Sequence, residues 1–290
     1  MTTMKIVGMG LVDKMRAEWG EPIQYFLRLG EEEVAANPLI TRRIRLRHTG
    51  RITCCHCGRA TKKSFSQGYC FPCFKKLAQC DSCIVSPEKC HYAAGTCREP
   101  SWGMAHCMVP HIVYLANSSG VKVGITRKTQ LPTRWIDQGA IQALPIYEVS
   151  TRHLSGLIEV IYGNLIPDKT NWRTMLKGNP APIDLAALRA RLHDQLLPEI
   201  EKQLAPDAFT AVHYLAESER AIDLPGKGTV VDIRYPVSQW PLKVGSFNLD
   251  KDPECEGVLM GIKGQYLILD TGCINIRKYG SYELELAVES

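Results

Sequence analysis

Several features are missing from this 290-residue sequence, and each absence narrows what the protein is. No apolar run approaches the roughly 18 residues that a membrane-spanning helix needs. Residues 1–9 lack a cationic segment followed by a long apolar stretch, so we expect no secretory signal peptide. No low-complexity tract interrupts the chain, and 45% of its residues are hydrophobic, enough to bury a core. We therefore expect a cytoplasmic protein of about two domains that does not contact a membrane.

Acidic residues are also missing from one long stretch. Residues 34–80 contain no Asp or Glu but ten Lys and Arg, whereas the whole chain has a net charge of only +5. A block of one sign predicts contact with a polyanion, here DNA or structured RNA. The predicted contacts are Arg42, Arg43, Arg45, Arg47, Arg51, Lys62, Lys63 and, further along the chain, Arg127. The alternatives are a solvated basic face, or cations that offset a thiolate-rich metal site.

Cysteine is concentrated in one segment: ten of the 12 cysteines fall within residues 54–107. The pair Cys54 and Cys57 is followed, after a short gap, by the pair Cys70 and Cys73. A Cys-x2-Cys turn directs two thiolates at one ion, and two such turns complete a tetrahedron around zinc. An iron–sulfur cluster is the alternative for four thiolates. A disulfide framework fits less well, because cytoplasmic thiols stay reduced.

A second group of cysteines follows the first. Cys80, Cys83, Cys90 and Cys107 are predicted to bind a second zinc ion, which gives one to two ions per chain. Cys97, His91 and His106 compete for the fourth position. Buried, unligated thiols are the simpler alternative for some of these residues, and we expect this of the isolated Cys255 and Cys273.

The hydrophobic pattern predicts an α+β fold with β-rich terminal parts. Alternation over 22–29 and 39–52 indicates strands, and period two places the arginines of the second stretch on one face. Helical spacing of leucines over 183–222 predicts helices interrupted at Pro198 and Pro206. The predicted segments are a β-rich basic part (1–53), a zinc-ribbon-like part (54–110), a β-β-α-β-α domain (111–182), amphipathic helices (183–224) and a β-rich C-terminal part (225–290).

The order β-β-α-β-α in the central domain comes from five short patterns. Strands are predicted over 112–116, 121–126 and 143–149, and the first two are joined by a turn of Asn, Ser and Gly. Helices are predicted over 131–138, with Thr129 as its cap, and over 153–165. The second helix carries one acid, Glu159, on an otherwise apolar face, and a buried carboxylate needs a partner or a metal ion.

These elements carry a resemblance to the GIY-YIG nucleases. Ile112-Val113-Tyr114 stands in place of Gly-Ile-Tyr, and Lys122-Val123-Gly124 in place of Tyr-Ile-Gly. The resemblance covers about residues 111–170. It implies that Glu159 would hold Mg²⁺ or Mn²⁺, that Arg134 would face the phosphate and that Tyr114 would orient or activate water. Lys122 would act as a base if desolvated, or would bind phosphate as a cation.

As a whole, the chain also resembles a bacterial family known as domain of unknown function 2797. The cysteine pairs, the run Lys-Val-Gly-Ile-Thr-Arg and the run from Arg134 to Ala140 carry this resemblance, which implies no activity. Three functions therefore stand as hypotheses. The first is a zinc-containing, metal-dependent endonuclease. The others are a nucleic-acid- or ribosome-associated protein that binds without cutting, and a zinc-organised module for a protein partner.

Overall fold

A computed structural model describes residues 3–215 and 229–290 of the chain, which divides into two compact units. The first unit consists of Met1–Lys76, Leu176–Gly178 and Ile233–Ser290, and the second of Leu77–Met175 and Asn179–Asp232. Both helices and sheets are present, so the predicted α+β class is confirmed. Within the described residues, no helix is long and apolar enough to cross a membrane.

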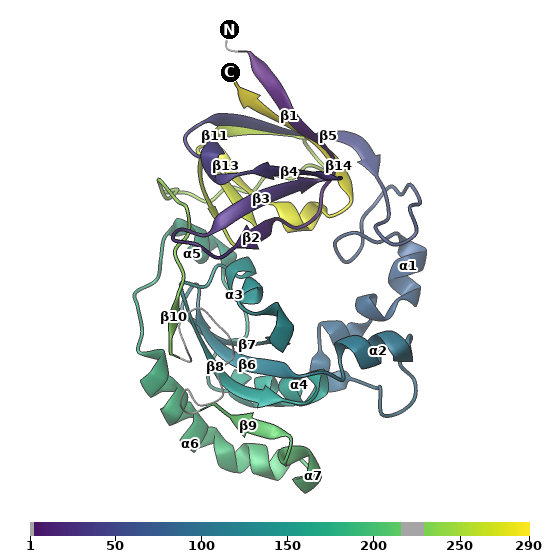
Figure 1. The fold of residues 1–290 in the computed structure, drawn as a ribbon, viewed down its shortest axis with the longest axis vertical. Coiled ribbons are helices and arrows are strands. Elements are labelled where there is room, and N and C mark those ends of the chain that lie inside the picture. Colours follow the sequence, from purple (N-terminus) through teal and green to yellow (C-terminus); the bar gives the residue numbers. More distant parts are fainter. Residues whose placement is uncertain (1–2, 216–228) are drawn as a thin grey trace. The chain divides into compact units, whose positions relative to one another are not determined.

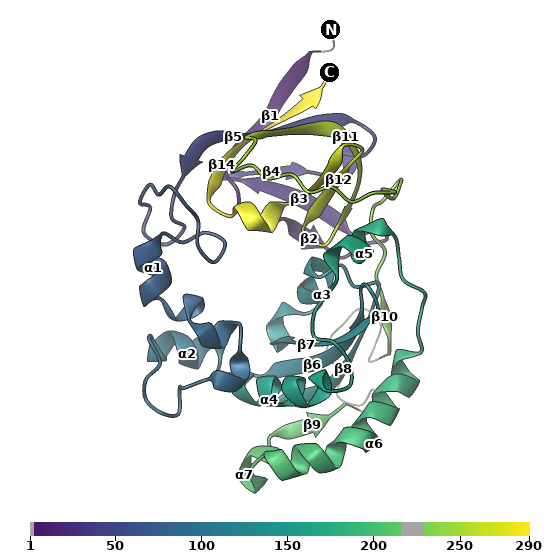
Figure 2. The ribbon, with the colours of Figure 1, turned by 180° about the vertical axis from the view of Figure 1, so that it is seen from behind.

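A six-stranded antiparallel sheet forms the body of the first unit. Its strand order is β1-β14-β5-β11-β12-β13. The strands are β1 (Met4–Leu11), β14 (Tyr282–Glu289), β5 (Arg43–Ile52), β11 (Glu254–Lys263), β12 (Tyr266–Leu269) and β13 (Gly272–Asn275). The N- and C-terminal parts of the chain therefore share one sheet, a question that the sequence left open. The two ends lie side by side in Figures 1 and 2 because β1 pairs with β14.

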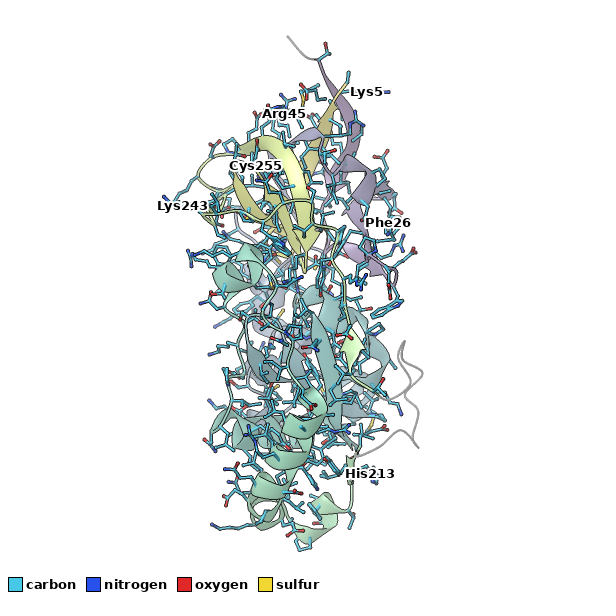
Figure 3. The ribbon with its side chains drawn as sticks, turned by 90° about the vertical axis from the view of Figure 1, so that its left-hand side faces the viewer. Lys5, Phe26, Arg45, His213, Lys243 and Cys255 are labelled. Carbon is cyan, nitrogen blue, oxygen red and sulfur yellow. The ribbon has the colours of Figure 1, made fainter. Side chains whose placement is uncertain are left out.

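The alternating pattern of β5 explains its place in the middle of this sheet. Ile44 and Leu46 are almost fully buried, whereas the arginines between them point to the other face. In the antiparallel register, Cys255 of β11 lies opposite Leu46, and it is buried as the sequence predicted. Figure 3 labels Arg45 and Cys255 on these neighbouring strands. Cys273 is equally buried, so both isolated cysteines are core residues.

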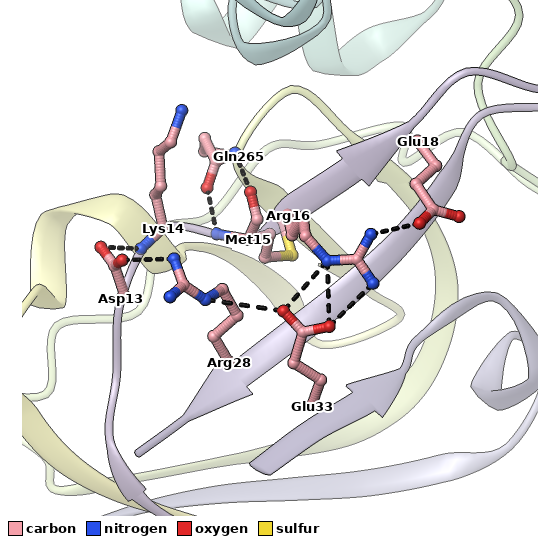
Figure 4. Close-up of polar contacts among 8 residues, drawn as sticks. All are labelled: Asp13, Lys14, Met15, Arg16, Glu18, Arg28, Glu33 and Gln265. Atoms are coloured by element: carbon pink, nitrogen blue, oxygen red, sulfur yellow. Dashed lines mark hydrogen bonds and ion pairs between the residues drawn. The ribbon is translucent and has the colours of Figure 1, made fainter. Parts of the chain in front are cut away.

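A smaller sheet in the same unit consists of β2 (Arg16–Glu18), β3 (Gln24–Leu29) and β4 (Glu32–Ala35). Its inner face carries the apolar residues of β3, and its outer face carries ion pairs. Arg16 contacts both Glu18 and Glu33, and Arg28 pairs with Asp13 at 2.6 Å (Figure 4). These pairs are solvent-exposed, so each contributes at most about 1 kcal/mol.

One buried amide joins the small sheet to the turn that precedes β12. Gln265 accepts a hydrogen bond from the Met15 backbone nitrogen at 2.8 Å and donates one to the Met15 carbonyl at 3.0 Å (Figure 4). Both residues are almost completely buried. The unit is completed by η1 (Asn37–Leu39), α1 (Phe71–Lys76) and η6 (Ile276–Tyr279).

The second unit is built on a sheet in the order β10-β8-β6-β7, with β9 also paired to β8. Its strands are β6 (His111–Asn117), β7 (Val121–Arg127), β8 (Gln142–Val149), β9 (Val212–Tyr214) and β10 (Val231–Asp232). Its longer helices are α3 (Thr133–Asp137), α4 (Arg152–Gly163) and α6 (Leu185–Gln203), and α7 (Pro206–Phe209) and α5 (Trp172–Lys177) are short. Helix α4 runs along β6, β7 and β8 in Figures 1 and 2 and buries Ile158, Ile161 and Tyr162. The order β-β-α-β-α predicted for this region is present.

Two local predictions in this unit were wrong. Helix α6 continues through Pro198, because burial of Leu196 and Ile200 on either side offsets the hydrogen bond that proline cannot make. Thr129 does not cap α3: it lies in the short helix η5 (Lys128–Gln130), and α3 begins only at Thr133. The predicted helical segment 183–224 and the β-rich segment from 225 both include positions among 216–228, which lie outside the described residues.

The cysteine-rich part of the second unit has little regular structure and is fastened to α4. It contains η2 (Ala78–Cys80), η3 (Ser82–Ile84), η4 (Pro87–Lys89) and α2 (Pro100–His106). A Cβ atom on Gly156 of α4 would lie 2.6 Å from the backbone nitrogen of Glu88, so glycine permits the close approach of η4. The amide of Arg152, at the start of α4, donates to the Cys107 carbonyl at 2.8 Å.

Candidate metal centre and active site

The four cysteines of the two Cys-x2-Cys pairs meet in the first unit. The sulfur atoms of Cys54, Cys57, Cys70 and Cys73 all lie within 4.8 Å of one another, and those of Cys57 and Cys70 are 3.7 Å apart. A tetrahedral zinc ion with Zn–S bonds of about 2.3 Å separates its sulfurs by about 3.8 Å. The spacing therefore fits a single ion and leaves no room for a multinuclear cluster.

Backbone groups prepare this site for a cation. Burial opposes ionisation of the Cys54 thiol, but hydrogen bonds from the backbone near Cys70, Cys57 and His56 lower its pKa to about 6. Amides directed at a thiolate are what a metal-binding knuckle supplies. Cys55 points elsewhere and interacts with Ser281 and Tyr69, which agrees with its prediction as the spare cysteine.

The second cysteine set differs from the predicted one. Cys83, Cys90, Cys97 and Cys107 line one cavity of about 20 Å³, and Cys80 is not among the described residues that line it. The backbone at Asp81 is extended between η2 and η3, so Cys80 and Cys83 do not share a turn of the kind that Cys54 and Cys57 share. The prediction of Cys80 as a ligand is therefore not supported by its position, and Cys97 takes its place.

Asp81 and His91 also lie close to Cys83, with ligand atoms within 4.8 Å. They are occupied by other contacts. The Asp81 carboxylate pairs with Arg98 at 2.8 Å and with His91 Nε2 at 3.3 Å. The other ring nitrogen of His91 contacts Thr96 Oγ1 at 2.8 Å. The remaining competitor, His106, uses Nδ1 on a backbone carbonyl of α2 and stacks on Trp102.

The four residues that the nuclease resemblance singled out come together in the second unit. Tyr114 lies on β6, Lys122 on β7, Arg134 on α3 and Glu159 on α4. The charges of Arg134 and Glu159 act on both Tyr114 and Lys122, so the four side chains share one electrostatic environment. Tyr114 is fully buried and Lys122 is 4% exposed, whereas Arg134 and Glu159 are partly open to solvent.

A short hydrogen-bonded chain fixes Tyr114 and Arg134. With the Gln138 amide oriented to satisfy both neighbours, its nitrogen is 2.7 Å from the Tyr114 hydroxyl and its oxygen accepts from Arg134 Nη2 at 3.1 Å. Gly124 lies opposite Tyr114 across the β6–β7 pair. A Cβ atom there would come within 2.7 Å of the tyrosine ring, which explains why this motif position is glycine.

Burial shifts the pKa values of these groups toward neutrality. It lowers the pKa of Lys122 to about 8, and the positive charge of Arg134 lowers it further. Burial also raises the pKa of Glu159 to about 7, against the attraction of Lys122. Tyr114 shifts the other way from a useful base, because burial raises its pKa to about 12. Opposed shifts of neighbouring groups are typical of functional sites.

Sequence reasoning missed two charged residues in this environment. Asp168, in the loop after α4, acts on both Glu159 and Lys122, and its carbonyl accepts from Lys122 Nζ at 3.2 Å. Arg152, at the start of α4, interacts with Glu159 and with the thiols of Cys107 and Cys83. Neither position follows a periodic pattern or a motif, so nothing in the sequence singled them out.

The predicted basic face is largely neutralised by acids from elsewhere in the chain. The arginines of β5 pair with glutamates of the neighbouring strands: Arg43 with Glu256, Arg45 with Glu254 and Glu285, Arg47 with Glu285, and Arg51 with Glu283. Arg42 donates to the Glu289 carbonyl. Arg127 lies on β7 in the second unit, where it acts on the Cys107 thiol. Lys62 and Lys63 remain exposed.

Comparison with known families agrees with the whole-chain resemblance. A family model described as "Protein of unknown function (DUF2797)" matches residues 41–284. No curated protein and no solved structure matches the chain. The match spans both cysteine sets and the environment around Glu159. Because it covers well over half of the 290 residues, the chain belongs to the DUF2797 family.

Proposed function

We propose that the protein is a zinc-containing nuclease that uses Mg²⁺ or Mn²⁺ to cleave phosphodiester bonds of DNA or structured RNA. One observation carries the proposal. The four residues that the resemblance to GIY-YIG nucleases implies come from four separate elements, yet they share one electrostatic environment. Cleavage of labelled DNA and RNA in the presence of either ion, beside a Glu159→Gln control, tests it.

Glu159 is the proposed ligand of the divalent ion. Its carboxylate is largely buried, and its raised pKa means that ionisation is costly until a cation compensates the charge. Asp168 offers a second carboxylate nearby, and hard cations such as Mg²⁺ prefer carboxylate oxygens. The ion would polarise a phosphoryl oxygen, and Arg134 would offset the charge that develops in the transition state.

Lys122 is a better candidate for the general base than Tyr114. At pH 8, a group with a pKa of about 8 is half deprotonated, whereas one with a pKa of about 12 is deprotonated in about one molecule in 10⁴. Tyr114 would instead orient water or substrate, because the hydrogen bond to Gln138 fixes its hydroxyl. The replacement of the second motif tyrosine by lysine is therefore compatible with catalysis.

We expect the affinity for Mn²⁺ to depend on pH in the range set by Glu159. Protonated Glu159 cannot bind the ion, so affinity should fall about tenfold per pH unit below its pKa of about 7 and level off above it. A carboxyl group with the ordinary pKa would lose affinity only below about pH 4.5. Titration of zinc-loaded protein with Mn²⁺, followed by electron paramagnetic resonance from pH 5 to 8, measures this. Constant affinity down to pH 5 would contradict the assignment, and Glu159→Gln serves as the control without the site.

Lys62 and Lys63 are the proposed phosphate contacts of the first unit, because the arginines of β5 are already paired with glutamates. Replacing both lysines with Gln should weaken nucleic-acid binding for all sequences alike. The slope of log affinity against log salt should fall by about 0.9 for each contact that is lost. The matched control is the double variant Lys243→Gln and Lys251→Gln, which removes the same charge from exposed positions outside the acid-free stretch. Equal slopes for the two double variants would rule out the assignment.

A second candidate function is nucleic-acid binding without cleavage. The complete burial of Tyr114 and the replacement of the first motif glycine by the buried Ile112 favour it. The two functions differ in one outcome: both predict salt-dependent binding, but only the first predicts product that requires a divalent ion.

A further inference from the structure

Four cysteines that are far apart in the sequence surround a single cavity in the second unit. Cys83 follows η3, Cys90 follows η4, Cys97 lies in the loop before α2, and Cys107 ends α2. Each of the other three thiols acts on Cys83, so the four are close neighbours. All of them are free thiols. Four thiols gathered from four separate turns indicate a metal centre more than a chance packing of small residues.

The space between these thiols is too large for one zinc ion. Four sulfurs around zinc lie about 3.8 Å apart, close to van der Waals contact, so they leave no room for a water molecule at their centre. The cavity here measures about 20 Å³, whereas roughly 10–15 Å³ suffices for a water. Among the described residues, the group of four cysteines whose sulfurs lie within 4.8 Å of one another is that of Cys54, and these four form no such group. The second set is therefore more widely spread than the first.

The surroundings of the cavity suit a group that is larger and negatively charged. Trp102 and Tyr92 line it beside the thiols, and such apolar walls limit access of water. The guanidinium groups of Arg152 and Arg127 lie near Cys107. Within the described part of the chain, Arg152 Nε is buried and has no hydrogen-bond partner, although Nη2 donates to the Ile84 carbonyl at 2.7 Å. A cluster with four thiolates carries the negative charge that this arginine faces.

We propose that Cys83, Cys90, Cys97 and Cys107 bind a four-iron, four-sulfur cluster, while Cys54, Cys57, Cys70 and Cys73 bind zinc. Four cysteine thiolates are the usual ligands of such a cluster. A mixed site of Asp81, Cys83 and His91 is the competing arrangement, but Arg98 and Thr96 already occupy the first and last of these side chains.

The cluster would hold the cysteine-rich segment on the helix that carries Glu159. Residues 78–107 contain only short helical turns, so few main-chain hydrogen bonds stabilise them. Cys107 accepts from the Arg152 amide, and η4 packs against Gly156. Ligation of Cys107 and Cys90 would therefore tie both contacts to one rigid group, one turn of α4 away from Glu159.

Metal analysis of the full chain, purified without oxygen, tests the proposal. We expect about four iron and about four acid-labile sulfide per chain, with broad visible absorption, beside one zinc. Cys97→Ser should lose the iron and the visible absorption but keep the zinc. Cys80→Ser and His91→Gln are the matched controls and should keep both metals.

Two zinc ions and no iron in the anaerobically purified protein would overturn the proposal. So would full iron content in Cys97→Ser, or loss of iron in His91→Gln, because the latter would assign the site to Asp81, Cys83 and His91. The metal content of the unmodified protein decides between iron and zinc even if a variant fails to fold. None of these outcomes depends on nuclease activity, so the two proposals stand or fall separately.

Discussion

Glu159→Gln abolishes cleavage that depends on Mg²⁺ or Mn²⁺, by at least about 10³-fold, and leaves the fold intact. The amide keeps the shape of the side chain but removes the charge that would hold the ion. The fold should tolerate the change, because burial makes the charged carboxylate unfavourable in the protein without the ion, as its raised pKa indicates. Rates of cleavage of labelled DNA and RNA, with far-ultraviolet circular dichroism for the fold, measure both effects.

Arg134→Lys provides a second test of the same site. The Gln138 oxygen accepts from both Nε and Nη2 of Arg134, and a lysine ammonium cannot reproduce this planar geometry. Activity should fall by about 10²-fold or more, while salt-dependent binding of nucleic acid changes little. Unchanged cleavage by Glu159→Gln would remove the ion from this position, whatever the result for Arg134→Lys.

Cys57→Ser has the largest expected effect on stability. It removes one of four ligands from the first thiol cluster, and the apparent binding free energy of a structural zinc ion is about 10–16 kcal/mol at pH 7. No apolar core replaces the ion there, because α1 contains no buried residue. We expect the zinc content to fall by one and amide hydrogens over residues 53–76 to exchange with solvent at rates close to those of an unfolded chain.

Cys55→Ser is the matched control for this variant. Its thiol lies outside the cluster, beside Ser281 and Tyr69, so zinc content and exchange protection should be retained. If Cys57→Ser kept its zinc and its melting temperature, the four-cysteine assignment would be wrong.

Local patterns in the sequence predicted the features that depend on near neighbours. The alternation of Ile44 and Leu46 with arginines identified β5, and the paired Cys-x2-Cys spacing identified the first thiol cluster. The turn at 117–120 identified the β6–β7 hairpin, which places Tyr114 opposite Gly124. In each case, the residues that decide the structure lie within a few positions of one another or repeat with a fixed period.

Features that depend on distant contacts could not be predicted in this way. The glutamates that neutralise the β5 arginines lie on β11 and β14, more than 200 residues away along the chain. Cys97 replaced Cys80 because the cavity is formed by the packing of four separate turns, and spacing alone favours the Cys80 and Cys83 pair. The lowered pKa of Lys122 results from burial, which the motif letters do not contain.

The measurement that tests the central claim most directly is a cleavage assay with the unmodified protein, its zinc content verified beforehand. Labelled single- and double-stranded DNA and structured RNA are incubated with the protein and Mg²⁺, Mn²⁺ or a chelator, at pH 8, where about half of Lys122 is neutral and Glu159 is ionised. The account predicts that at least one substrate is cut in the presence of a divalent ion and that none is cut with the chelator. If every substrate stays intact while salt-dependent binding is retained, the nuclease assignment is contradicted and a binding function remains.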